Sequence, residues 1–352
     1  MSLETAWLAL LGLLLAGYFV LGGYDYGVQM LRPLLRDGAR DETQNAHNAH
    51  NAQDAHGTHD ALDAIAPFFL GNEVWLVAFA GVLFGAFPHL EGSLLPGLHP
   101  LVVAILAGLV LGNAAVQLRR RACGARGRRA WDALIVAGGA VPAACWGLVV
   151  GLLLHGVPRR ADGSFRVGAA EVFTPFVLAC GATTLLLFAA HGAAFAALRA
   201  PARQLAARAH QLGVRLIGAS GAAATLALLL TVFGSGADLT NRTAPAVVAV
   251  VLAGAFGAAW WSFAAGHPVR AFVSTCLATA LPVLLVGAGH YPYLLISSAG
   301  RGLDVGHAVT DDATLTILSA FGIFVVPTVL AYQAWSWWAF RGRAGHRHPR
   351  YF

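Results

Sequence analysis

Three ionisable side chains lie inside long apolar runs of this 352-residue sequence: Asp25, Glu73 and His191. A charged group at mid-membrane depth costs at least about 2.5–3.5 kcal/mol, so such residues are candidates for function. Two carboxyl groups that share a low-dielectric site do not both ionise readily, and one of them then holds a proton near neutral pH. Asp25 and Glu73 therefore predict a proton relay. The polar residues beside them are candidate hydrogen-bond partners: Asn72, Tyr24 and Tyr26.

A packing role for the same residues stays open. Neutral carboxyl groups, or carboxylates paired with arginine, would equally well fix contacts between helices. His191 invites a haem interpretation, because haem iron takes axial His or Met ligands, but the sequence has only two methionines, Met1 and Met30. We expect a hydrogen-bonded structural or interface histidine instead. Two further residues are candidates for polar or interface roles: Asp132 and Trp75.

The elements that carry these residues are predicted membrane-spanning helices. The sequence is 57% hydrophobic and only 11% charged, whereas a soluble domain has about 25% charged residues. Crossing the roughly 30 Å hydrocarbon core takes about 20 apolar residues, and nine such runs predict an all-α polytopic membrane protein. The predicted spans are Ala6–Leu31, Pro67–Leu90, Pro100–Leu118, Asp132–His155, Val172–Leu198, Gly213–Ser235, Ala244–Ala265, Ala271–Gly289 and Thr314–Phe340.

The 23 basic residues are all arginine, and they predict the orientation of the helices. Cytoplasmic loops carry the excess of arginine, and here the excess alternates from loop to loop. One side receives 18 arginines, which places the N-terminus outside and the C-terminus in the cytoplasm, in agreement with an odd number of spans. The three intramembrane ionisable residues then share one level on the cytoplasmic side. The other side has five arginines: Arg159, Arg160, Arg166, Arg242 and Arg301.

The chain is predicted to be a single membrane domain over residues 1–352. Helices one to four occupy residues 1–156, helices five to eight residues 172–289, and helix nine residues 314–340, followed by a basic cytoplasmic tail at 341–352. Residues 41–65 form a low-complexity cytoplasmic loop rich in His, Asn and Ala. A solvated loop is favoured there, although histidines at i, i+3 spacing are weak candidates for metal binding. These are His47, His50, His56 and His59.

Several other classes of protein are disfavoured. The four cysteines form no CxxC pair, so neither a disulfide framework nor a zinc site is indicated. The sequence contains no motif typical of nucleotide binding or hydrolysis. Because the arginines follow the loops, the net charge of +6 reflects topology and does not indicate a nucleic-acid partner.

Two stretches carry a specific likeness to a known family. Residues 22–31 (GGYDYGVQML), and residues 71–76 (GNEVWL) followed by 84–88 (FGAFP), resemble subunit II of the cytochrome bd quinol oxidases. Weaker similarities follow in the same order along the chain. They lie at 131–132, 156–158 and 312–314, and at Pro327, Tyr332 and Trp335 in the last helix.

The resemblance implies a heterodimer in the bacterial cytoplasmic membrane. A larger subunit I would carry haems b and d and the quinol site and reduce oxygen to water, while this haem-free subunit supports assembly and contributes a proton path. The implied fold is two four-helix bundles plus a peripheral helix. Quinol, lipids and a small accessory subunit are the further partners implied. Some members bind a structural quinone in subunit II, for which no residue is assigned here.

One position departs from the family pattern. Many members have an aspartate immediately before Gly71, in a place associated with proton transfer, and this chain has Leu70. That part of the family's proton path does not carry over.

Two alternatives remain beside an oxidase subunit with a proton path. One is a proton-coupled secondary transporter, which buried acids would also suit, and the other is a non-catalytic assembly scaffold of a divergent oxidase.

Overall fold

Each of the nine predicted apolar runs forms a helix that is long and apolar enough to cross a membrane, which confirms the predicted count for the part of the chain that the structure describes. The structure is a computed structural model, and it describes residues 2–35, 62–65, 67–119, 124–160, 163–199, 203–234, 236–297 and 300–340. The long helices are α1 (Leu3–Leu35), α4 (Phe69–Ala86), α6 (His99–Leu118), α7 (Gly124–His155), α9 (Pro175–Arg199), α10 (Arg203–Val232), α11 (Thr243–Ala264), α12 (Pro268–His290) and α14 (Asp312–Ala339).

Shorter elements connect them. They are the helices α3 (Leu62–Ile65), α5 (Pro88–Gly97), α8 (Ala169–Val172) and α13 (Val305–Ala308), and the strands β1 (Tyr293–Ser297) and β2 (Gly300–Asp304). Apart from α3, the predicted loop at 41–65 lies outside the described residues, and so does the predicted tail at 341–352. The four candidate metal-binding histidines, His47, His50, His56 and His59, fall in that undescribed part.

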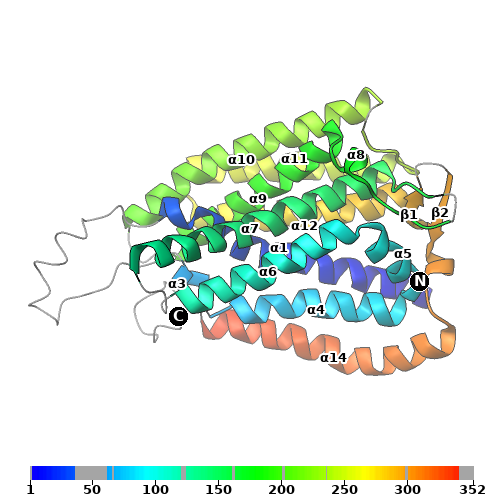
Figure 1. Ribbon diagram of the computed structural model, residues 1–352. Helices are drawn as coiled ribbons and strands as arrows, with labels where there is room; N and C mark the ends of the chain where they lie inside the picture. The colour runs from blue at the N-terminus through cyan, green and yellow to red at the C-terminus, as the bar shows by residue number, and fades with distance from the viewer. Residues whose placement is uncertain are drawn as a thin grey trace, which may run out of the picture.

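The long helices run side by side and form two sets of four plus one outer helix (Figure 1). The first set is α1, α4, α6 and α7, and the second is α9, α10, α11 and α12. The sets meet where α1 packs on α9 and α12 and where α7 packs on α9. Helix α14 lies along α4, and only 6% of its membrane-length window is buried, so it is the peripheral helix. The predicted two bundles with a ninth, peripheral helix are confirmed.

Small residues allow the two sets to approach closely. Gly27 of α1 faces Gly192 of α9, and a Cβ atom added to Gly27 would lie 2.7 Å from the Gly192 Cα. A Cβ on Gly192 would collide with the backbone of Gly27 and Val28. In a membrane, helices associate through close packing of this kind, because the apolar surroundings supply little hydrophobic driving force.

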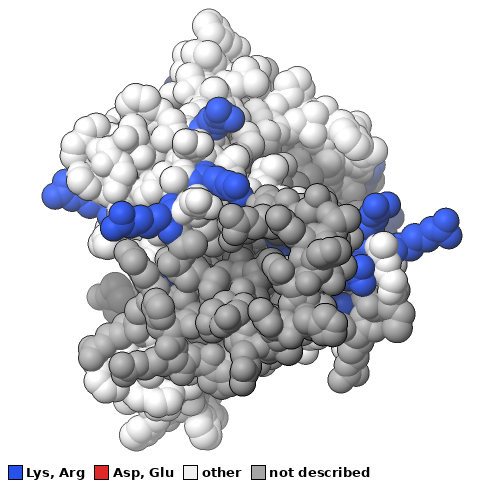
Figure 2. Space-filling view, turned by 90° about the vertical axis from the view of Figure 1, so that its left-hand side faces the viewer, with Lys and Arg blue, Asp and Glu red and all other residues white. Residues whose placement is uncertain are grey.

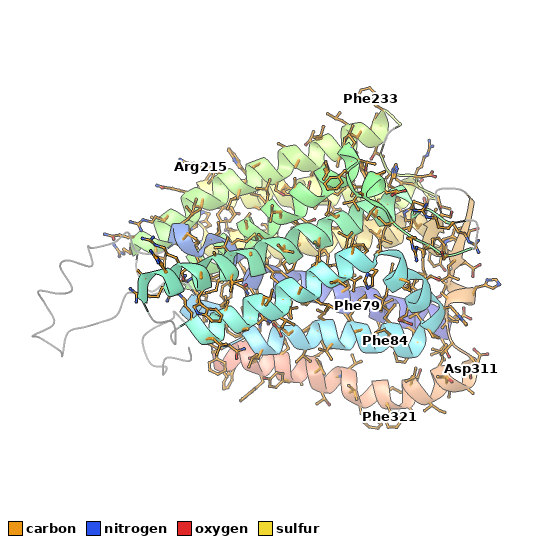
Figure 3. The ribbon with its side chains drawn as sticks, viewed as in Figure 1. Phe79, Phe84, Arg215, Phe233, Asp311 and Phe321 are labelled. Atoms are coloured by element: carbon orange, nitrogen blue, oxygen red, sulfur yellow. The ribbon has the colours of Figure 1, made fainter. Side chains whose placement is uncertain are left out.

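Apolar side chains cover the outside of the helix assembly. Phe84 of α4, Phe233 directly after α10, and Phe321 of α14 point outward, where a soluble protein would carry polar residues (Figure 3). Most helices are also longer than predicted. For example, α7 begins at Gly124 and not at Asp132, and α10 begins at Arg203 and not at Gly213. Hydropathy detects only the apolar part of a helix, and these two continue beyond it into polar sequence.

The predicted span Pro67–Leu90 is wrong as a single helix. Helix α4 ends at Ala86, and α5 begins at Pro88 after Phe87, whose φ of −128° and ψ of 55° are not helical. Proline lacks a backbone N–H and disfavours helical geometry in the residue before it, which explains the break.

A small hairpin covers one end of the assembly, where no strand was predicted. Strands β1 and β2 pair antiparallel, and the Val157 N–H after α7 donates to the Ile296 carbonyl at 2.9 Å. We call this the hairpin end.

Two aspartates at the hairpin end cap helices. Asp311 caps α14, and hydrogen bonds from the backbone and hydroxyl of Thr314 hold the pKa of Asp311 below its usual value. Similarly, the His307 ring and backbone N–H lower the pKa of Asp304.

The opposite end is basic, and we call it the arginine end. Figure 2 looks onto it and shows arginine side chains with no acidic side chain among the described atoms in view. The described arginines thus separate by end as the loop pattern predicts. Those at the arginine end are Arg32, Arg119, Arg126, Arg128, Arg129, Arg199, Arg203, Arg208, Arg215 and Arg270.

The contact between the two helix sets can be tested by a substitution that adds one methyl group. We expect Gly27→Ala to lower the melting temperature of the purified protein, because overpacking typically costs about 1–3 kcal/mol and backbone atoms on both helices leave no room to relax. Gly12→Ala, in the same helix but with no atom within 4 Å of the added Cβ, is the matched control. Equal melting temperatures for the two variants would contradict the close contact.

Candidate functional site

Asp25 lies at the centre of a buried polar cluster between α1 and α4. The Nδ2 atom of Asn72 donates to Asp25 Oδ2 at 2.8 Å and to the Tyr24 hydroxyl at 2.6 Å. It also approaches the Leu21 carbonyl at 3.3 Å. Asp25, Asn72 and Tyr24 are therefore brought together, as the sequence predicts.

No cation among the described residues lies beside the Asp25 carboxyl group. It forms no ion pair with any described residue, and its second oxygen, Oδ1, is buried and accepts no hydrogen bond from them. The Asn72 carbonyl oxygen is likewise buried without a donor. Burying an isolated carboxylate is very unfavourable, and the group neutralises instead. Among the described residues, this environment favours a protonated carboxyl group over the arginine-paired alternative for Asp25.

Glu73 forms its hydrogen bond to a residue other than Asp25, although it is next to Asn72 in the chain. Neighbouring helical residues point about 100° apart, so Asn72 faces α1 while Glu73 faces α6. There Glu73 Oε1 accepts a hydrogen bond from the amide of Asn113. The carboxyl group is partly buried, and Leu70, one turn earlier in α4, is 65% exposed. The predicted direct contact between the two acids is thus replaced by two separate polar pairs on different faces of α4.

Tyr26 has a different partner from the predicted one. Its hydroxyl bonds to the hydroxyl of Tyr18, two turns earlier in α1, and both rings are buried. The Tyr18 ring also packs edge-on against Trp146 of α7, with ring centroids 5.9 Å apart. Tyr26 therefore helps to fix α1 against α7 and does not hydrogen-bond to Asp25.

His191 is fully buried where α1, α9 and α12 meet. Its Nε2 lies 2.9 Å from the Val20 carbonyl, which only accepts, so this nitrogen carries the proton. Its Nδ1 lies 2.8 Å from the Thr275 hydroxyl. The ring stacks on Phe272 with centroids 5.1 Å apart. With both nitrogens engaged, the imidazole offers no lone pair to a haem iron, as expected of a structural histidine.

Asp132 joins three helices at the arginine end. One oxygen, Oδ1, accepts hydrogen bonds from Arg32 of α1 and, at 2.5 Å, from Nε of Arg119 after α6. The Arg32 side chain is 1% exposed and that of Asp132 is 20% exposed. In contrast to Asp25, this aspartate has two cations beside it, which favours the ionised form.

Trp75 and Arg199 are among the residues that attach the peripheral helix α14. Trp75 of α4 is buried, and its Nε1 donates to Gln333 at 3.4 Å. Arg199 at the end of α9 donates from Nη1 to the Phe340 carbonyl at 2.7 Å and lies 5.3 Å over the Phe68 ring. Trp75 therefore lies at an interface within the chain, between α4 and α14.

Asn113 and Thr275 are among the partners in the site that were not predicted. Asn113 interrupts the apolar run of α6, and a polar residue in such a place is a signal that the sequence does provide. Thr275 gives no such signal, because a threonine hydroxyl in a membrane helix commonly donates to its own backbone, whereas here its single proton is donated to His191 Nδ1. No group of three His, Cys, Asp or Glu residues that could hold a metal occurs within the described ranges.

Comparison with known proteins places this arrangement in a family. A family model described as cytochrome bd terminal oxidase subunit II matches residues 3–340. The chain is 26% identical to the cytochrome bd ubiquinol oxidase subunit 2 of Bacillus subtilis (strain 168), over 99% of this chain and 98% of that protein. It is also 26% identical to the cytochrome bd-I ubiquinol oxidase subunit 2 of Escherichia coli (strain K12), over 97% and 95% of the respective chains.

A solved structure shares the fold. A chain in the structure of bd oxidase from Geobacillus thermodenitrificans matches 97% of this chain and 100% of its own length, with a TM-score of 0.66 and 17% identity. The resemblance seen in the sequence motifs is confirmed by the family model, which extends over nearly the whole chain. The chain therefore belongs to the cytochrome bd terminal oxidase subunit II family and is one subunit of a bacterial membrane-bound terminal quinol oxidase, an oxidoreductase that includes a subunit I partner.

Proposed function

We propose that this chain is the haem-free subunit of its oxidase, and that it supports subunit I and supplies a proton path from the arginine end. The haems b and d of the complex then belong to subunit I. The observation that carries the proton path is the buried Asp25 carboxyl group, which has hydrogen-bonding neighbours but no cation. Membership of the oxidase family favours this function over a proton-coupled transporter.

The absence of haem from this chain is supported by His191. Its two ring nitrogens already engage the Val20 carbonyl and the Thr275 hydroxyl, so binding iron would break one of the two hydrogen bonds and separate packed helices. The described residues therefore do not fit an axial haem site at this position. Quinol, lipids and a small accessory subunit are further partners in the proposal, which assigns no residue to quinol or to a structural quinone.

Asp25 and Glu73 have different parts in the proposed path. Asp25 holds a proton in the interior, and Asn72 and Tyr24 fix the orientation of its carboxyl group. Glu73 is the one carboxyl group of α4, and it lies on the side of that helix where Leu70 is exposed. It can therefore exchange a proton with water or with a partner at the surface, while Asn113 keeps it in place. Glu73 thus supplies an acid one turn from the position where many family members have an aspartate.

The proposed path is tested by removing each acid in the assembled oxidase. We expect Asp25→Asn and Glu73→Gln each to reduce quinol-driven oxygen uptake by about tenfold or more, because an amide cannot pass on a proton. Haem content per complex should stay normal. Asp238→Asn, at an exposed position of the hairpin end, is the control. Unchanged turnover in both variants would reject the path and leave the assembly scaffold.

Asp132 supports assembly in this proposal and takes no part in proton transfer. Removing one partner of a buried ion pair costs roughly 3–5 kcal/mol, and we expect about 2–4 kcal/mol for Asp132→Asn because its carboxylate is 20% exposed. The variant should melt at a lower temperature and assemble in lower yield than Asp238→Asn. Its oxygen uptake per haem should equal that of the wild type. A normal melting temperature with reduced turnover per haem would reverse the assignment.

We also propose that the arginine end faces the cytoplasm. The separation of the described arginines between the two ends supports this orientation, because the excess of arginine marks the cytoplasmic side.

The orientation is tested with single cysteines at exposed positions. We expect Thr240→Cys, at the hairpin end, to react with a membrane-impermeant maleimide in intact spheroplasts. Ala207→Cys, at the arginine end, should react only after permeabilisation. The described native cysteines are buried or partly buried, which limits background labelling. The opposite labelling pattern would invert the orientation.

A further inference from the structure

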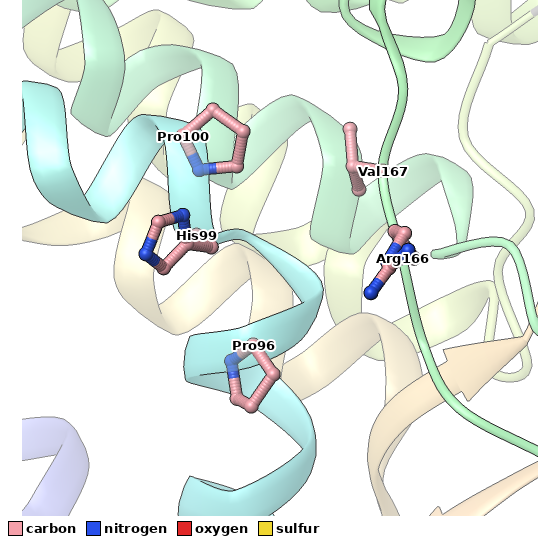
Figure 4. A pocket seen from close by; sticks show the side chains of 5 residues that line it. All are labelled: Pro96, His99, Pro100, Arg166 and Val167. Carbon is pink, nitrogen blue, oxygen red and sulfur yellow. The ribbon is translucent and has the colours of Figure 1, made fainter.

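A pocket opens at the hairpin end, beside the junction of α5 and α6. It has a volume of about 360 Å³ and lies between that junction and the segment that follows α7 (Figure 4). A backbone hydrogen bond holds the two walls together, since Val167 N–H donates to the Gly97 carbonyl at 2.9 Å. Within the segment after α7, Arg166 N–H donates to the Pro158 carbonyl at 3.1 Å. The lining residues are Pro96, His99, Pro100, Arg166 and Val167.

The charge of the lining selects an anion. Arg166 and His99 are exposed and provide the polar side chains of the lining, which contains no carboxyl group. Arg166 also forms no ion pair with the acids of the described ranges. A guanidinium matches a phosphate with two parallel hydrogen bonds, and an imidazole adds another donor. The pocket is therefore complementary to a phosphate group.

An exposed apolar stripe leads away from the pocket along α6. Val103, Leu106 and Val110 follow His99 at intervals of four, seven and eleven residues, which places all four on one face of the helix. The three apolar residues are 48%, 50% and 61% exposed, while Leu101 and Ile105 on the other face are buried. The stripe extends about 16 Å from His99, close to the roughly 15 Å hydrocarbon depth of one leaflet.

We propose that this pocket and stripe bind a glycerophospholipid of the leaflet at the hairpin end. Arg166 and His99 hold the phosphodiester, and an acyl chain lies along Val103, Leu106 and Val110. The stripe distinguishes a lipid from free phosphate, because an inorganic anion would gain nothing from an apolar track that begins at its binding site. The site is separate from the acids at the other end of the helices, so it stands or falls independently of the proton path.

The experiment uses the purified two-subunit oxidase after delipidation. Native mass spectrometry would measure the binding of added phosphatidylglycerol to the wild type and to Arg166→Gln, His99→Gln and Arg242→Gln. Arg242 is an exposed arginine at the same end but outside the pocket, and it serves as the matched control. We expect the tightest lipid adduct to weaken about tenfold in the two pocket variants and to be unchanged in the control.

A second comparison separates the lipid from its headgroup. Val103→Ser combined with Leu106→Ser should weaken phosphatidylglycerol binding in the same assay, and glycerol phosphate should compete only weakly with the lipid. Lipid binding that is equal in the pocket variants and in Arg242→Gln would overturn the proposal. Strong competition by glycerol phosphate or inorganic phosphate, with no effect of the serine substitutions, would also overturn it, because the site would then bind a free anion.

Discussion

The close approach of α1 and α9 at Gly27 and Gly192 is the constraint on which the rest of the interior depends. It brings the backbones of the two helix sets together without intervening side chains. The ring of His191, one residue before this contact, can then reach the Val20 carbonyl across the interface. The Tyr24 ring, three residues before Gly27, packs edge-on to the same imidazole with centroids 5.9 Å apart. Thus the contact positions the segment that carries Asp25.

Polar groups inside the membrane have no water to bond to, so they must form hydrogen bonds with one another. This requirement explains the hydrogen-bonded pairs in the interior. Asn72 and Glu73 illustrate it, because α4 directs one of them to Asp25 and the other to Asn113. Helix α4 thereby holds one residue that bonds to the buried Asp25 and, next to it in the chain, a partly buried acid that bonds to α6. The helix rotation that satisfies Asn72 is the same one that leaves Leu70 exposed.

The sequence predicts the features that depend only on the depth of a residue in the membrane. Hydropathy and arginine alternation yield nine spans, and a shared level for Asp25, Glu73 and His191, because each signal measures depth in the membrane. The rotation of each helix depends on packing against its neighbours, which one-dimensional patterns do not contain. For this reason the Tyr18 partner of Tyr26 was missed. The break at Phe87 was missed for another reason, since the apolar run continues through it although Pro88 ends α4.

Asp132 and Asp25 show how the surroundings of an aspartate decide between a structural and a chemical role. Asp132 has two arginines within hydrogen-bonding distance, so protonating it would cost two charge-assisted contacts, and it is best suited to hold α1, α6 and α7 together. Asp25 has an amide donor and a buried free oxygen, so gaining a proton removes an unfavourable buried charge without breaking an ion pair. A group used in proton transfer must be able to take up a proton without losing an ion pair. Of the two aspartates, Asp25 alone meets that condition, and the substitution of leucine at position 70 leaves it unchanged because Leu70 lies on the outward face of α4.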